Sequence, residues 1–266
     1  FGEQPRAGYG CPCGAWKGTP KFTQLRNITA DASSEGLWYT GSTRGALMCG
    51  RFAISIASFD QLEKFLFVLR GQEAQQGCAF PWPDGCAPDP AAVTGRDAIP
   101  PGSKILAVLA SSSAGVPVAG FPVWGMRRNL AGRSRTLINL RSEKLAAHEA
   151  GAGLVRCLIP ADGFYEWSPS GEAWLFRRED SALFAMAGLR DPADGTCAIL
   201  TRPADPVVAL VHHRMPFIPA AGGYAAWLAG RPGLPVGCPE PLVGARLHTA
   251  RKAVDGPDPQ GLLFPD

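Results

Sequence analysis

Residues 156–188 read RCLIPADGFYEWSPSGEAWLFRREDSALFAMAG. The stretch holds four short apolar runs, which are separated by segments rich in Gly, Pro, Ser and Asp. Apolar runs of this length, bounded by turn-forming residues, are typical of paired β-strands. Two further runs, at 196–201 and 207–211, continue the pattern. The sequence therefore predicts a mostly antiparallel β core.

A few helices are expected beside this core. Residues 58–69 predict a helix, because Ser58 is a good N-cap and the Leu and Phe residues that follow recur at helical spacing. The same rules predict strands at 51–56, 104–110 and 117–124, short helices at 143–150 and 222–228, and a Pro- and Gly-rich loop at 71–102. We therefore expect an α+β fold with one domain.

The composition is that of an ordinary globular protein. Of the 266 residues, 46% are hydrophobic and 18% are charged, and the net charge of +3 permits nucleic-acid binding without requiring it. No apolar run approaches the roughly 18 residues that span a bilayer. The eight cysteines lack CxxC spacing, and neither a phosphate-binding loop nor a dinucleotide fingerprint is present. We expect a cytoplasmic monomer with no metal and no cofactor.

Residues 1–47 differ from the rest of the chain. They are rich in Gly, Ser and Thr, they show no sustained helical or strand period, and the first methionine is Met48. We interpret them as a leader, either disordered or translated from an upstream region, and we expect the folded domain to comprise residues 48–266.

Cys49 directly follows this first methionine. If translation starts at Met48 and the methionine is removed, Cys49 carries both an α-amine and a thiol. The α-amine has a pKa of about 7.7–8.0, so much of it is neutral near pH 7 and able to form a Schiff base with an aldehyde. The thiol then closes a five-membered thiazolidine ring. The alternative is that Cys49 is a small buried apolar residue.

Two further clusters carry acid–base groups. Glu166 lies between two aromatic residues, Tyr165 and Trp167, where a carboxyl group suits proton transfer and Trp167 suits stacking on a base. His212 and His213 follow the apolar run 207–211, and a histidine at a strand end is a good acid–base candidate. The alternatives are an edge-strand carboxylate beside core aromatics and a pair of surface histidines.

A basic stretch precedes Glu143 and has almost no acidic counterweight. Its arginines are Arg127, Arg128, Arg133, Arg135 and Arg141. Such a stretch is able to follow a phosphate backbone, and the alternative is a solvated loop.

Four motifs occur in order along the chain: MCGRF at 48–52, INLRSE at 138–143, PADGFYEW at 160–167 and HHRMP at 212–216. Together they resemble the signature set of the SRAP family, the SOS response-associated peptidases or abasic-site processing proteins. The resemblance covers Met48 to about Leu228. It implies a single α+β domain with a twisted β core. It also implies a DNA-damage-response protein that crosslinks to abasic sites in single-stranded DNA through a thiazolidine and shields them, associated with the nucleoid when bound.

The resemblance also implies residue roles. Cys49 matches the catalytic cysteine, Asn139 the residue that positions its amine, and Glu166 the proton shuttle. His212 matches a histidine near the sugar and its phosphate. The implied DNA contacts are phosphate binding by Arg51, Arg141 and Arg214, base packing by Trp124 and Trp167, and a pocket wall at Thr201.

The chain departs from the usual family pattern at Leu140 (usually Ala), at His213 (usually acidic), and at 97–101 and 124–128.

Two other functions stay open. One is a thiol peptidase that uses Cys49 and His212, on itself or on other substrates, with lyase-type chemistry also implied by the family. The other is a non-catalytic single-strand DNA binder.

Overall fold

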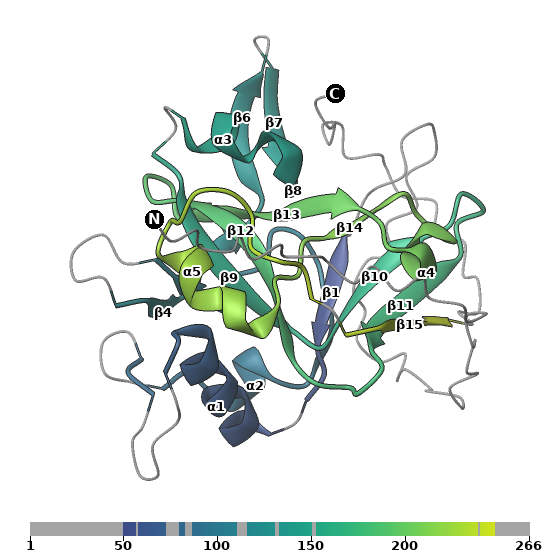
Figure 1. Ribbon diagram of the computed structural model, residues 1–266, viewed down its shortest axis with the longest axis horizontal. Helices are drawn as coiled ribbons and strands as arrows, with labels where there is room; N and C mark the ends of the chain where they lie inside the picture. Colours follow the sequence, from purple (N-terminus) through teal and green to yellow (C-terminus); the bar gives the residue numbers. More distant parts are fainter. Residues whose placement is uncertain are drawn as a thin grey trace, which may run out of the picture.

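A computed structural model describes residues 50–56, 58–72, 80–82, 87–110, 116–130, 133–150, 153–238 and 240–247. Two β-sheets and a β-hairpin make up most of this part of the chain, with short helices around them (Figure 1). The fold is α+β and mostly antiparallel, as predicted. None of its described helices is long and apolar enough to cross a membrane.

The first sheet has five antiparallel strands in the order β15-β11-β10-β1-β2. Their bounds are β1 Arg51–Ile54, β2 Arg96–Ile99, β10 Gly163–Trp167, β11 Ala173–Arg178 and β15 Leu242–Arg246. Strand β1 lies between β2 and β10, with Arg51 opposite Tyr165. The Asp162 carboxylate accepts hydrogen bonds from the backbone N–H groups of Ser55 and Ile56, at 2.7 and 3.0 Å, and so fixes the end of β1.

The second sheet has eight strands, with an antiparallel path β14-β13-β12-β9-β3-β4. These strands are β3 Ala107–Leu109, β4 Val118–Gly120, β9 Val155–Ala161, β12 Phe184–Asp191, β13 Thr196–Pro203 and β14 Arg214–Pro216. Two more strands, β5 Val123–Trp124 and β8 Asn139–Arg141, pair with β13 in parallel.

The main core lies between the two sheets. Phe52, Phe164 and Phe176 of the first sheet pack there with Ile159 and Phe184 of the second, all essentially unexposed. Side chains alternate between the two faces of a strand, so each strand contributes every second residue to this layer. The position of a residue on its strand therefore decides whether it faces the inter-sheet layer.

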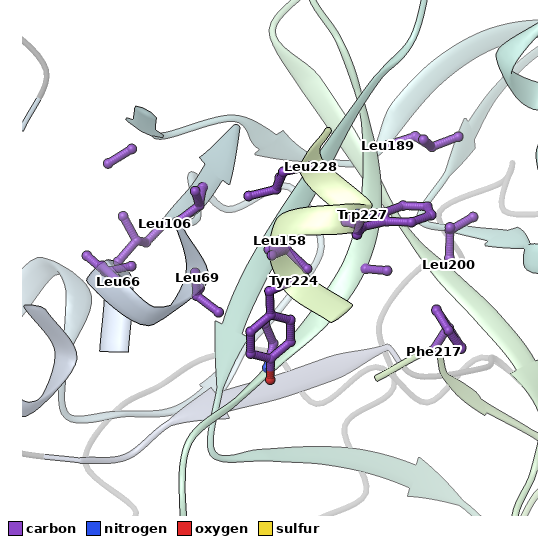
Figure 2. Packing of buried hydrophobic residues seen from close by; sticks show 14 of the residues in the cluster. Leu66, Leu69, Leu106, Leu158, Leu189, Leu200, Phe217, Tyr224, Trp227 and Leu228 are labelled. Atoms are coloured by element: carbon purple, nitrogen blue, oxygen red, sulfur yellow. The ribbon is translucent and has the colours of Figure 1, made fainter. Parts of the chain in front are cut away.

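Helices lie around the two sheets, and Leu66 and Trp227 from two of them pack on the other face of the eight-stranded sheet, whereas Val208 from another packs in the layer between the sheets. The helices are α1 Phe59–Leu69, α2 Pro90–Val93, α3 Leu145–Glu149, α4 Pro206–Ala209 and α5 Tyr224–Leu228, and the 3-10 turns are Ser142–Lys144 and Ala221–Gly223. In Figure 2, Tyr224 and Trp227 of α5 point toward the sheet while Leu66 and Leu69 belong to α1. The Trp227 indole donates a 2.9 Å hydrogen bond to the Cys157 carbonyl, so α5 is anchored by polar as well as apolar contacts.

Several predicted elements are confirmed, and the predicted strand at 207–211 is wrong. Helix α1 begins after Ser58, whose hydroxyl accepts a 3.2 Å hydrogen bond from the Gln61 N–H. The run 207–211 lies instead in and after helix α4, with Asp205 and Pro206 at the helix start. A five-residue apolar run is too short for its period to separate strand from helix, and Pro at the first helical position favours the helix.

The stretch 71–102 was predicted to be a loop, and its described part contains two elements. Asp89 caps α2 by accepting a 3.0 Å hydrogen bond from the Ala91 N–H, and β2 follows at Arg96–Ile99. The basic stretch is also ordered, as a hairpin of β6 Met126–Leu130 and β7 Arg133–Leu137, which Figure 1 shows standing away from both sheets.

Candidate active site

Four of the predicted site residues face the layer between the sheets. On β10, Phe164 belongs to the inter-sheet core, so Glu166 two positions later faces the same layer. On β13, Ile199 belongs to that core, and Thr201 follows it on the same face. Asn139 and Arg141 of β8 pair with Ile199 and Thr201. Strand alternation thus gathers residues from two of the motifs together with Thr201.

Glu166 and His212 form the centre of this group. Glu166 is 0% exposed and His212 is 5% exposed. The Glu166 Oε2 atom lies 3.7 Å from the Nδ1 atom of His212. His212 follows α4, and its backbone N–H donates to the Val208 carbonyl at 2.9 Å, so the helix end holds the imidazole at this position.

The protonation state of His212 follows from its surroundings. Burial lowers the pKa of His212 below its ordinary value of 6.5, and the charges of His213 and Arg214 lower it further, while a hydrogen bond with the Arg214 backbone opposes them. The imidazole is therefore neutral at pH 7, and its contact with Glu166 is not a full ion pair. Its Nδ1 atom lies 3.2 Å from both the N–H and the carbonyl oxygen of Arg214, so either tautomer finds a partner there.

The Arg214 guanidinium is buried and binds several protein groups. Its side chain is 8% exposed, and its Nη1 and Nη2 atoms donate to the two oxygens of Glu143, at 2.5 and 2.9 Å. Nη2 also donates to the Thr201 carbonyl at 2.6 Å and lies 3.2 Å from the Thr201 hydroxyl. With both terminal nitrogens engaged and the charge paired, the guanidinium has little left for a phosphate. The phosphate contact that the resemblance implied at Arg214 stays a prediction.

The remaining residues of the predicted site differ in exposure. Asn139 is buried and Arg141 is half-buried. Arg51 and Trp167 are half-buried and lie on the opposite face of the five-stranded sheet from Glu166, because Arg51 pairs with Tyr165 and Trp167 follows Glu166 directly. Burial lowers the pKa of Arg51, which stays far above neutral pH. Cys49 lies outside the described residues, which begin at its neighbour Gly50.

Trp124 is fully buried, so its ring surface is not open to a base in this structure, in contrast to the predicted base packing. The residue is 0% exposed, and its indole N–H donates to the Ile138 carbonyl at 2.9 Å. Its ring contacts Phe52 edge-on, with centroids 5.3 Å apart. The neighbouring Gly125 has a φ of +132°, so the chain turns sharply after burying the indole. Nothing in the local sequence distinguishes a buried Trp from a stacking one.

A surface depression of about 390 Å³ lies elsewhere. Arg70, Ala225 and Arg231 are among the residues that line it, and none of the predicted site residues does. The converging acid–base groups, and not the size of a cavity, therefore define the candidate site.

The SOS response associated peptidase (SRAP) family model matches residues 48–236. The chain belongs to this family. The match includes all four motifs and every described element from β1 to α5.

One segment of the chain is similar in sequence to three proteins of Bacillus subtilis (strain 168). Over 106 residues the chain is 36% identical to the abasic site processing protein YoaM and 35% identical to the abasic site processing proteins YobE and YoqW. The matched segment is 35% of this chain and 47–48% of those proteins, so it spans about half the length of the relatives.

Solved structures share the SRAP chain's fold. A phage-related protein from Bordetella bronchiseptica superposes with a TM-score of 0.54 at 22% identity, covering 76% of this chain and 95% of that protein. A protein from Bacteroides thetaiotaomicron gives a TM-score of 0.51 at 15% identity, covering 75% and 92%. At these identities the likeness concerns the fold alone.

Residues of the second, third and fourth SRAP motifs lie together at this site, and Glu143 joins two of these motifs. Glu143 closes the second motif and binds Arg214 of the fourth, across 71 positions of sequence. Sequence reasoning noted Glu143 only as the end of a basic stretch. Its place in a motif was the available signal, but its partner was not readable from the chain.

Proposed function

We propose that this SRAP protein processes abasic sites in single-stranded DNA by forming a covalent thiazolidine through Cys49. The observation that carries the proposal is the buried pair Glu166 and His212, with 3.7 Å between Oε2 and Nδ1. A carboxyl group and a neutral imidazole so close together are suited to moving protons during sugar opening and imine formation. The family membership and the names of the relatives support the same reaction class.

The path of β1 supports Cys49 as the nucleophile. Arg51 pairs with Tyr165 in an antiparallel register, so the chain before Arg51 runs alongside Glu166. Consecutive α-carbons are about 3.8 Å apart, and Cys49 is joined directly to Gly50. Because Cys49 is the residue before Gly50 in the sequence, we propose that its amine and thiol act beside Glu166.

The proposed chemistry needs a free α-amine on Cys49. The amine attacks the aldehyde of the ring-opened sugar and water leaves, which gives an imine. The thiol then adds to the imine carbon and its proton passes to the nitrogen, which closes the thiazolidine. We infer that the functional chain begins at Cys49, by initiation at Met48 and loss of that methionine or by removal of residues 1–48. We also propose a folded domain of residues 48–266.

The test uses protein expressed from Met48, with removal of the methionine verified by intact mass. It is mixed with a single-stranded oligonucleotide that carries one abasic site and run on a denaturing gel beside Cys49→Ala. A band that needs the abasic site and Cys49 supports the proposal. Acetylation of the α-amine abolishes that band, whereas peptidase activity that survives acetylation would favour a thiol peptidase.

A further inference from the structure

The β6–β7 hairpin is the strongest unexplained basic feature of the molecule. Residues 126–137 read MRRNLAGRSRTL, with four arginines and no acidic residue. Arg128 and Arg135 lie directly opposite each other on the two strands. Like charges in this position destabilise a strand pair unless another group compensates them.

The charges of the hairpin are only partly compensated. Arg128 binds Asp191 at 2.9 Å. Arg127 is exposed and Arg135 is half-buried, and neither forms an ion pair within the described ranges. Arg127 and Arg128 are adjacent, so they point to opposite faces of the hairpin. Both faces therefore carry an arginine.

The base of the hairpin is fixed to the core beside the candidate site. Trp124 lies just before β6 and Ile138 just after β7, and the 2.9 Å hydrogen bond between them closes the base. Gly125 donates to the Cys197 carbonyl at 2.8 Å, and a side chain at Gly125 would meet Thr136 at 2.9 Å. Strand β7 then continues through Ile138 into Asn139 and Arg141.

We propose that this hairpin, residues 126–137, is an arm that binds the phosphate backbone of single-stranded DNA flanking the site captured at Cys49. The inference rests on the proposed function. Five-residue strands extend about 17 Å, so the arm extends about this far from its base, which continues into β8 with Asn139 and Arg141. Arginines bind phosphates without reading the sequence, which fits a protein that meets damage in any sequence context.

The experiment measures non-covalent binding of the full chain to undamaged single-stranded DNA at several salt concentrations. Two oligonucleotides are compared, of about 5 and about 16 nucleotides. The variants are Arg127→Ala/Arg135→Ala and its charge-retaining counterpart Arg127→Lys/Arg135→Lys. Arg127 and Arg135 lie on opposite faces of the hairpin. Because single strands lose about 0.7 of slope per phosphate contact, the alanine variant is expected to flatten the salt dependence by roughly 0.7 when the strand follows one face and roughly 1.4 when it contacts both, on the long oligonucleotide only. The lysine variant restores most of the slope.

A matched control distinguishes the loss of an arginine in the arm from the loss of one positive charge anywhere on the protein. Lys64 is exposed on α1, a helix that Figure 1 shows at the opposite end of the molecule from the hairpin, so Lys64→Ala is compared with the single variant Arg127→Ala. Equal effects of these two substitutions would overturn the proposal, as would an equal loss on both oligonucleotides. An unchanged salt dependence in the alanine variant would also overturn the proposal, and would favour a protein partner for the arm in place of DNA. Failure of abasic-site capture by the chain starting at Cys49 would count against the proposed function and would not alter this comparison.

Discussion

Arg214 and Glu143 form an ion pair with two hydrogen bonds, at 2.5 and 2.9 Å, that joins the segment after Asn139 to the segment after His212. The arginine side chain is 8% exposed and that of Glu143 is 48% exposed. The Arg214 backbone contacts His212 through both its N–H and its carbonyl. The pair thus supports the position of the imidazole without touching it.

Glu143→Gln is expected to lower the free energy of unfolding by about 1 kcal/mol at pH 7, since hydrogen bonds to a charged group are lost from a half-exposed pair. The hydrogen bonds from Arg214 lower the pKa of Glu143 below 4.5, so the ionised pair stabilises the fold above that pH. This stabilisation is lost as pH falls through the folded-state pKa. Urea unfolding at pH 7 and at acid pH measures it.

Glu172→Gln is the matched control, because Glu172 pairs with Arg246 at the surface with side chains 35% and 49% exposed. It is expected to change stability by less than about 0.5 kcal/mol. Equal losses of stability in both variants would contradict a specific contribution of the Glu143–Arg214 pair to the free energy of unfolding. A Glu143→Gln loss that persists at acid pH would contradict it too.

His212 is expected to titrate below pH 6.5, and this is measurable by NMR of its ring protons. A folded-state pKa below the unfolded value means that neutral His212 favours the fold, and that this contribution is lost as pH falls through the folded pKa. The groups around the ring are Glu166, His213 and Arg214. His213→Asn removes one positive neighbour and is expected to raise the pKa of His212. A wild-type pKa above 6.5 would contradict this account.

The two tryptophans once expected to pack on bases are predicted to behave differently. Trp124→Phe is expected to cost about 1–3 kcal/mol of unfolding free energy, because a buried volume is emptied and the Ile138 carbonyl loses its donor. Trp167 is half-buried, and Trp167→Ala is expected to weaken single-strand DNA binding by about 1–3 kcal/mol. Thermal melts and anisotropy titrations of both variants check this. DNA binding lost equally in folded Trp124→Phe would contradict it.

Local signals in the sequence predicted much of the fold. The helix after Ser58 was marked by a cap and a helical apolar face, and the strands in 156–188 by turn residues between apolar runs. The hairpin 126–137 was missed because its outward positions are polar and arginine-rich, so no apolar alternation marks it. The strand predicted at 207–211 failed because a helix start at Asp205 and Pro206 outweighed a short apolar run.

The candidate site was predicted as a set of motifs but not as a geometry. Glu166 and His212 meet because β10 and the end of α4 belong to different layers of one core, which no local pattern records. The same holds for Arg214 and Glu143, whose ion pair joins two motifs that lie far apart in the sequence. Burial of Trp124 depends on contacts with Phe52 and Ile138, and both residues are distant from it in the sequence.

The central claim concerns the bond at Cys49, and intact mass of the adduct tests it most directly. Protein starting at Cys49 is incubated with an abasic single-stranded oligonucleotide and compared with Cys49→Ser, which keeps the amine but lacks the thiol. The account predicts a stable adduct whose mass is that of protein plus oligonucleotide minus one water, absent from the serine variant after hydrolysis. No adduct, or an equally stable adduct in Cys49→Ser, would contradict it.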